Sequence, residues 1–396
     1  MIKTENPYRP GAGVMPMYLA GREKDIEAMS RVFDSLLVGI PVQSVIYTGL
    51  RGVGKTVLLN TFNEIAQEKG IFCKHIEVET RNDFIAQIIS CAQGFLRQIS
   101  NKEKLKVVLD KCLDALKTLS VSFNPNENTF SISAQEQIFY KVPSLTQSLT
   151  DVFTSLGETA KKANQPICFF VDEIQYMKEN ELSSLIAALH RSNQLGYPIM
   201  MVGAGLPKII AMLANEKSYS ERLFSYKRIG SLTDDEAKAA IITPVKNSGV
   251  TYTEDAISEI IAITKNYPFF IQQLCQILFE NDVTQIGIAD VKGSENQFFH
   301  VLDTGFFDVR YSRCTDGERV FIFAMVKCGE LPCTIQNVAK NMKKTVNAIS
   351  TTRAQLISKG IIYSVRFKEL DFTVPEFDGF IRRNSAYQDW RGQIGK

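Results

Sequence analysis

The sequence predicts an α/β fold, with a parallel sheet in a three-layer αβα arrangement. A small helical domain and a C-terminal domain of three helices and a β-hairpin are expected to follow. Short apolar runs typical of strands alternate with helical patterns over the first part of the chain. The pattern then becomes purely helical, and it changes again after Thr315. We therefore expect domains at 1–230, 231–312 and 313–396.

The first predicted strand, Val42–Thr48, leads directly into Gly-Leu-Arg-Gly-Val-Gly-Lys-Thr at 49–56, and a helical pattern follows at 57–66. A strand, a G-x-x-x-x-G-K-T sequence and a helix in this order predict a P-loop. The glycines let several N–H groups point at one phosphate, and the helix start adds partial positive charge. The residues expected to bind ATP in this way are Gly49, Gly52, Val53, Gly54, Lys55, Thr56 and Val57.

A second apolar run, 166–171, reads as a buried parallel strand and ends in Asp172 and Glu173. Oxygen ligands suit Mg²⁺, so Asp172 and Thr56 are expected to hold this cation. Lys55 is expected to reach the β- and γ-phosphates, and Glu173 to polarise the attacking water as general base. The predicted cofactors are ATP and Mg²⁺, and the predicted activity is ATP hydrolysis.

Further strands are predicted at 72–78, 199–202 and 227–229, separated by helical patterns such as 181–195. Strands that alternate with helices predict a parallel sheet with helices on both faces.

Between 100 and 141 this alternation breaks. A helix is predicted at 102–119, and short β-patterns at 121–123 and 130–133 flank a polar segment. They predict a hairpin that leaves the core. This insertion is either a partner surface or an ordinary surface excursion.

Gly21-Arg22-Glu23 before a helix, the P-loop and the Asp172-Glu173 strand end together resemble the AAA+ ATPases of the origin-recognition type and the neighbouring STAND-like ATPases. The resemblance implies that Arg22 lies beside the adenine. It also implies that Arg222, in the segment 219–224, acts as an arginine finger, in trans from a neighbouring subunit of a homo-oligomer. The alternative for Arg222 is a salt-bridged surface arginine.

Two departures from that family matter. The strand at 199–202 ends in Gly-Ala-Gly, where these ATPases often place a polar residue. The turn Asn266-Tyr267-Pro268 resembles the Gly-x-Pro turn of STAND-like lids and lacks the arginine of many AAA+ lids. Pro268 is therefore a candidate nucleotide contact. Both departures leave ATP binding intact and favour a slow switch over a fast motor.

Helices predicted at 234–247, 254–265 and 268–281 form a lid, and 290–311 is predicted to be a connecting helix whose aromatic residues serve packing. The next helices, at 316–327, 334–342 and 345–359, precede strands at 361–366 and 370–374. Three helices followed by a β-hairpin predict a winged helix-turn-helix.

The C-terminal segment is basic: residues 311–396 contain 14 Lys and Arg against 8 Asp and Glu, while the whole chain has a net charge of +2. A basic reading helix and wing predict contact with double-stranded DNA, because cations meet phosphates and polar side chains read base edges. The candidate contacts are Lys343, Lys344, Asn347, Thr351, Arg353, Arg366 and Lys368. Contact of the winged helix with a protein is the alternative.

Eight scattered cysteines without a C-x-x-C pair, and only three histidines, argue against zinc and for reduced core thiols. With no long apolar run and no signal-peptide pattern, we expect a cytoplasmic protein that does not contact a membrane.

Three hypotheses follow from the sequence. The first is an ATP-dependent DNA-binding AAA+ switch. The second is a STAND-like signalling ATPase in which nucleotide controls oligomerisation and the winged helix contacts protein. The third is a nucleotide-dependent scaffold that hydrolyses almost nothing.

Overall fold

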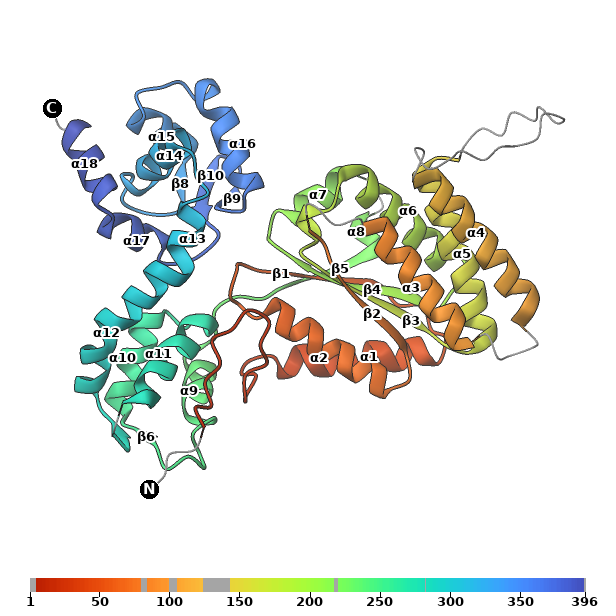
Figure 1. Cartoon of the computed structure of the whole chain (residues 1–396), viewed down its shortest axis with the longest axis horizontal. Coiled ribbons are helices and arrows are strands. Elements are labelled where there is room, and N and C mark those ends of the chain that lie inside the picture. Colours follow the sequence, from red (N-terminus) through yellow and green to blue (C-terminus); the bar gives the residue numbers. More distant parts are fainter. Residues whose placement is uncertain are drawn as a thin grey trace. The chain divides into compact units, whose positions relative to one another are not determined.

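The computed structural model describes residues 5–79, 84–99, 105–123, 143–216, 220–281 and 283–394 (Figure 1). The chain divides into two compact units. The first, here called the sheet unit, comprises Arg22–Gly49 and Lys55–Ile229. The second, here called the helical unit, comprises Met1–Gly21, Leu50–Gly54 and Gly230–Lys396. Within these described ranges, no helix is long and apolar enough to cross a membrane.

A parallel sheet of five strands lies at the centre of the sheet unit. The strands are β1 (Ser44–Thr48), β2 (Phe72–Glu77), β3 (Ile167–Asp172), β4 (Ile199–Gly205) and β5 (Phe224–Arg228). Their spatial order is β2-β3-β4-β1-β5. Strand β4 therefore separates the strand that ends at Asp172 from the strand that leads into the P-loop. The predicted parallel sheet is confirmed, although β5 begins at Phe224, three residues before the predicted start.

Helices cover both faces of this sheet, which confirms the predicted αβα layers (Figure 1). Helices α1 (Glu23–Leu37) and α2 (Lys55–Glu68) lie on one face. The other face carries α3 (Phe84–Ile99), α5 (Leu145–Ala163) and α6 (Glu179–Gln194). The remaining helices are α4 (Lys106–Phe123), α7 (Ile209–Glu216) and α8 (Ser220–Leu223), with the 3₁₀ turn η2 (Ile174–Tyr176) after β3.

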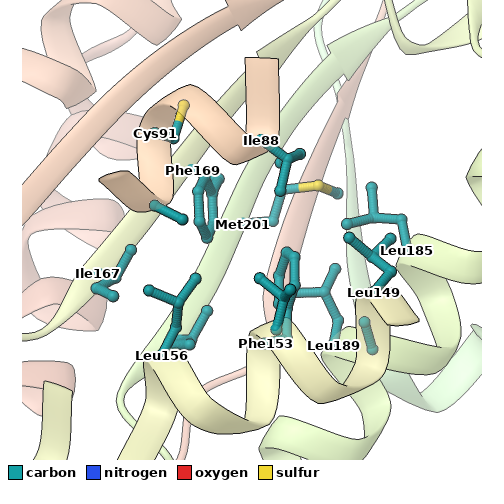
Figure 2. Packing of buried hydrophobic residues seen from close by; sticks show 14 of the residues in the cluster. Ile88, Cys91, Leu149, Phe153, Leu156, Ile167, Phe169, Leu185, Leu189 and Met201 are labelled. Atoms are coloured by element: carbon teal, nitrogen blue, oxygen red, sulfur yellow. The ribbon is translucent and has the colours of Figure 1, made fainter. Parts of the chain in front are cut away.

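Each face of the sheet packs against its helices and forms an apolar core. Alternate strand residues contribute to the two cores, because successive side chains of a strand point to opposite faces. Phe169 of β3 and Met201 of β4 pack among residues of α3, α5 and α6 (Figure 2). Phe170, the next residue of β3, instead meets Phe33 of α1, with ring centroids 6.4 Å apart. These four side chains are at most 3% exposed. Packing on both faces fixes the carboxyl ends of the strands, where the predicted site residues lie.

The prediction of the first strand of the hairpin in the insertion is wrong. Residues 121–123 form the last turn of helix α4, which continues beyond the predicted end at Leu119. The helical hydrogen bonds of the preceding turns extend into this segment and override the local β-propensity of Val121 and Phe123. The second predicted strand, 130–133, lies outside the described residues.

The helical unit begins with a bundle of three helices, α9 (Asp234–Ile242), α10 (Glu254–Thr264) and α11 (Pro268–Glu280). The short strands β6 (Thr251–Tyr252) and β7 (Gln285–Ile286) pair in parallel beside it. Helix α9 opens with a capping box, in which Thr233 and Glu236 exchange side-chain and backbone hydrogen bonds. It ends five residues before the predicted Asn247, because Pro244 has no N–H and cannot continue a helix.

The N-terminal segment of the chain packs against this bundle and forms hydrogen bonds with it. Tyr8 is 1% exposed, and its hydroxyl donates a hydrogen bond to the Ile241 carbonyl of α9 at 2.5 Å. The Asn6 side-chain amide donates to the Gln276 carbonyl of α11 at 3.1 Å. Residues 6–8 therefore pack with helices that lie more than 220 residues further along the chain.

The predicted connecting helix is interrupted. It consists of α12 (Ile288–Leu302), a π-helical turn η3 (Asp303–Phe307) and α13 (Asp308–Tyr311). Its aromatic residues serve packing, as expected: Phe306 stacks on Phe269 at 4.8 Å, and Phe307 stacks on Phe380 at 5.6 Å between ring centroids.

The C-terminal part contains α14 (Asp316–Val326), β8 (Cys333–Thr334), α15 (Ile335–Asn341), the 3₁₀ turn η4 (Asn347–Ile349), α16 (Ser350–Ser358), β9 (Ile362–Arg366) and β10 (Glu369–Phe372). The strands form an antiparallel sheet in the order β8-β10-β9. The predicted single helix at 345–359 is thus a 3₁₀ turn followed by a shorter α-helix. Two further helices, α17 (Phe377–Arg383) and α18 (Ser385–Ile394), were not predicted.

Candidate nucleotide-binding site

The P-loop has the backbone that its glycines predict. Gly52 and Gly54 have φ values of 86° and 90°, which lie in the left-handed region where only glycine is unstrained. Gly49 follows β1, and its N–H donates to the Gly205 carbonyl at the end of β4, at 3.1 Å. This bond joins the start of the loop to the central strand of the sheet.

Helix α2 begins at Lys55, so Lys55, Thr56 and Val57 occupy its first turn. The N–H groups of a first helical turn have no partners within the helix and attract anions. Lys55 is only 6% exposed. Val53 and Val57 are buried at 2% and 7%, so their side chains pack while their N–H groups remain the candidate phosphate ligands.

The structure brings the two predicted metal ligands together. Thr56 Oγ1 lies 2.6 Å from Asp172 Oδ2, although 116 residues separate them in sequence. Asp172 is 2% exposed, and its other oxygen accepts a hydrogen bond from the Glu173 N–H at 2.7 Å. A buried carboxylate held beside a hydroxyl at the first turn of the P-loop helix is a donor set that fits Mg²⁺. When bound, this cation would neutralise phosphate charge, with Thr56 and Asp172 as its protein ligands.

Glu173 follows directly at the end of β3 and has a left-handed backbone, with φ at 53°. A non-glycine residue in this conformation costs roughly 1–3 kcal/mol, and such residues cluster at functional sites. The Gln175 side-chain amide donates a hydrogen bond to the Glu173 carboxylate.

Sequence reasoning missed Gln175. Its side chain is 4% exposed and contacts both Glu173 and the end of β4, where Leu206 N–H donates to Gln175 Oε1 at 2.9 Å. The available signal was the Gly-Ala-Gly sequence at the end of β4, which indicates that another group approaches that strand closely.

Three other predicted contact residues lie on other elements. Arg22 is the N-cap residue of α1 and is 6% exposed. Pro268 is the first residue of α11 in the helical unit. Arg222 lies exposed on the short helix α8, at the start of β5, and its carbonyl accepts a hydrogen bond from Gln43 at 2.7 Å.

The predicted DNA contacts all lie in the C-terminal part, and most of them are exposed. Lys343 and Lys344 follow α15, and Asn347 begins the turn before α16. Thr351 and Arg353 lie on α16, where Thr351 is exposed and Arg353 is half-buried. Arg366 ends β9, and Lys368 lies in the turn to β10 with φ at 65°.

The fold and this site define a P-loop nucleotide-binding protein. Residues 18–202 match the AAA ATPase domain, and residues 304–381 match a domain of unknown function, DUF8462. This first part of the chain is therefore an AAA ATPase domain, and the protein is an ATPase. No curated protein matches the sequence.

Solved structures with the same fold include a Walker-type ATPase of Pyrococcus abyssi, at 14% identity and a TM-score of 0.55, covering 94% of this chain and 98% of that one. Cdc6p of Pyrobaculum aerophilum is similar at 16% identity, with a TM-score of 0.48 and coverage of 97% and 98%. The Aeropyrum pernix ORC1 protein, solved in complex with DNA, has 14% identity, a TM-score of 0.47 and coverage of 92% of each chain.

Proposed function

We propose that the protein is a slow, Mg²⁺-dependent ATPase switch that couples its nucleotide state to binding of double-stranded DNA. The proposed ATPase activity rests on the 2.6 Å contact between Thr56 and Asp172, which lie beside Glu173. Lys55 holds the β- and γ-phosphates. A water oxygen bonds to the γ-phosphorus, its proton passes to Glu173, and the bond to the bridging oxygen breaks to release ADP and phosphate.

Replacement of the general base tests this assignment. Glu173→Gln keeps the size and the hydrogen-bonding geometry of the side chain but removes the basic oxygen. We expect the turnover rate to fall roughly 10²–10⁴-fold, while bound ATP accumulates. Turnover at the wild-type rate would remove Glu173 as the base.

The order of elements supports a winged helix-turn-helix in the C-terminal part. Helix α14, strand β8, helices α15 and α16, and strands β9 and β10 follow one another, and the strands form one antiparallel sheet. In this arrangement α16 is the reading helix and the β9–β10 turn is the wing. The exposed Lys343 and Lys344, in the segment between α15 and α16, and the exposed Lys368 in the wing offer cations to phosphates.

The double variant Lys343→Ala and Arg353→Ala tests the DNA contact. The log of the DNA affinity falls as the log of the salt concentration rises. Each lost phosphate contact should make the slope of this line less steep by about 1. We expect weaker binding to duplex DNA at all sequences and a salt slope that is smaller by about 2. Unchanged affinity would show that the reading helix is placed wrongly.

One observation favours the STAND-like alternative, in which the same domain contacts protein. Phe367 at the tip of the wing is 88% exposed, and an apolar side chain there suits a protein surface better than phosphates. The two functions differ in their response to nucleotide. A salt-sensitive gain in DNA affinity on adding ATP supports the DNA switch, whereas ATP-dependent oligomerisation without DNA affinity supports the alternative.

We further propose that Arg222 completes the ATP site of a neighbouring subunit. Its exposure on α8 supports this role, since a finger that acts in trans must reach beyond its own chain. Comparison of the particle mass with and without ATP tests it. A monomer under both conditions would exclude a role in trans.

A further inference from the structure

The amide of Gln175 bridges two strands at the carboxyl edge of the sheet. Gln175 lies in the turn η2, directly after β3, and is 4% exposed. Its Nε2 donates to the Glu173 carboxylate, and its Oε1 accepts from the Leu206 N–H, which follows β4, at 2.9 Å. Both ends of the amide are therefore used inside the sheet unit.

The end of β4 is shaped to receive this turn. A Cβ on Gly205 would lie 2.5 Å from Gln175 Oε1, and a Cβ on Gly203 would lie 2.3 Å from Ile174 Cδ1. At these distances a larger residue would displace the end of the η2 side chain that it meets, so the two glycines leave room for Ile174 and Gln175 as they lie here. The strand therefore lacks side chains of its own where η2 packs against it.

The bond to Leu206 fixes which way the amide of Gln175 points. A backbone N–H can only donate, so the carbonyl oxygen of Gln175 must face Leu206. The NH₂ group must then face Glu173, whose ionised carboxylate can only accept. Rotation of the amide would place donor against donor at one end and acceptor against acceptor at the other. The donor is thus presented to Glu173 in one orientation.

We propose that Gln175 is the positioning residue for the general base. It holds Glu173 Oε2, so that Oε1 is the oxygen that accepts the proton of the attacking water. The proposal rests on Glu173 as the base, proposed above. The left-handed backbone of Glu173 sets where its side chain starts, and Gln175 sets where its carboxylate ends. The glycines of β4 are then part of the catalytic architecture, because they make room for η2.

Gln175→Met tests the proposal, because it keeps the volume of the buried side chain and removes both hydrogen bonds. Loss of a hydrogen bond to a charged group corresponds to a fall in kcat of roughly ten- to a hundred-fold. The Kd for ATP, measured by equilibrium binding, should change less than about two-fold, because Gln175 does not belong to the phosphate-binding residues. Should this variant fail to fold, Gln175→Glu keeps the shape and the Leu206 bond but offers Glu173 no donor when ionised.

Gln165→Met is the matched control. Gln165 also donates a side-chain hydrogen bond, in its case to the Gly70 backbone carbonyl, but it precedes β3 and lies at the opposite end of that strand. We expect its kcat to equal the wild-type value.

A double variant separates positioning from a purely structural role. If Gln175 acts through Glu173, adding Gln175→Met to Glu173→Gln should cause no further fall in single-turnover hydrolysis. A kcat for Gln175→Met that is unchanged or raised, or an equal further fall in the double variant, would overturn the proposal. Wild-type turnover in Glu173→Gln alone would instead refute the assignment of the base.

Discussion

Thr56→Val should destabilise the sheet unit even without nucleotide. Valine keeps the shape of threonine and removes only the hydroxyl. The Asp172 carboxylate is 2% exposed and receives two hydrogen bonds, from Thr56 Oγ1 at 2.6 Å and from the Glu173 N–H at 2.7 Å. A lost hydrogen bond to a charged group costs about 1.5–3 kcal/mol. For a domain of the sheet unit's size, about 2 kcal/mol lowers Tm by about 4–8 °C.

Differential scanning calorimetry of the full chain measures this shift. The transition that rises on adding Mg²⁺ and ADP to the wild type identifies the sheet unit, because a ligand stabilises the state that binds it. In Thr56→Val this transition should have a lower midpoint temperature without ligand. The midpoint should also rise less when the ligand is added, since the variant loses a proposed ligand of Mg²⁺.

Thr61→Val supplies the matched control on the same helix. The hydroxyl of Thr61 donates only to the Val57 carbonyl of α2, at 3.0 Å, and contacts no buried charge. Its removal should cost less than about 1 kcal/mol. If Thr56→Val melts at the wild-type temperature, or if both variants lose the same stability, the buried carboxylate does not depend on Thr56 and our reasoning fails.

Two further predictions concern titrating groups of the C-terminal part. Burial alone would raise the pKa of Glu318, but hydrogen bonds from Lys359 Nζ and the Thr315 N–H outweigh it and lower that pKa. A lowered folded-state pKa gives stability that is present above the unfolded pKa of about 4.3 and is lost as the pH falls through the folded pKa. The Lys359 side chain is 35% exposed, so solvent screens part of this ion pair. In thermal melts near neutral pH, Lys359→Met should lose about 1 kcal/mol and its stability should depend less on acid; an unaltered acid dependence would contradict this. Hydrogen bonds from Cys333 and Asn341 lower the pKa of Cys328, whereas burial raises the pKa of Cys73, Cys91 and Cys112 to about 12. Iodoacetamide near pH 7.5 should therefore modify Cys328 first, and mass spectrometry that finds another cysteine labelled first would refute the prediction.

The local features of the sheet unit could be predicted from sequence because each has a local signal. The apolar run before Asp172 marks a buried strand, and G-x-x-x-x-G-K-T marks the turn into α2. Sequence spacing also implied that Thr56 and Asp172 meet, since the carboxyl ends of parallel strands share one edge of the sheet.

Features that depend on contacts between distant segments could not be predicted. Gln175 has no local signal, because its partner Leu206 follows another strand, β4, 31 residues further along the chain. The end of α4 was predicted too early because Val121 and Phe123 favour strands locally. Helices α17 and α18 are short and follow Pro375, so their periodicity is weak; buried residues such as Phe380 and Tyr387 hold them in place.

The attachment of Asn6 and Tyr8 to helices α9 and α11 has a consequence for biosynthesis. On the ribosome the segment with Asn6 and Tyr8 emerges before its partners, most of which are translated only after the sheet unit. Tyr8 must therefore stay exposed to chaperones while more than half of the chain is made. A tag or fusion placed at the N-terminus should consequently disturb maturation of the helical unit and leave the ATP-binding sheet intact.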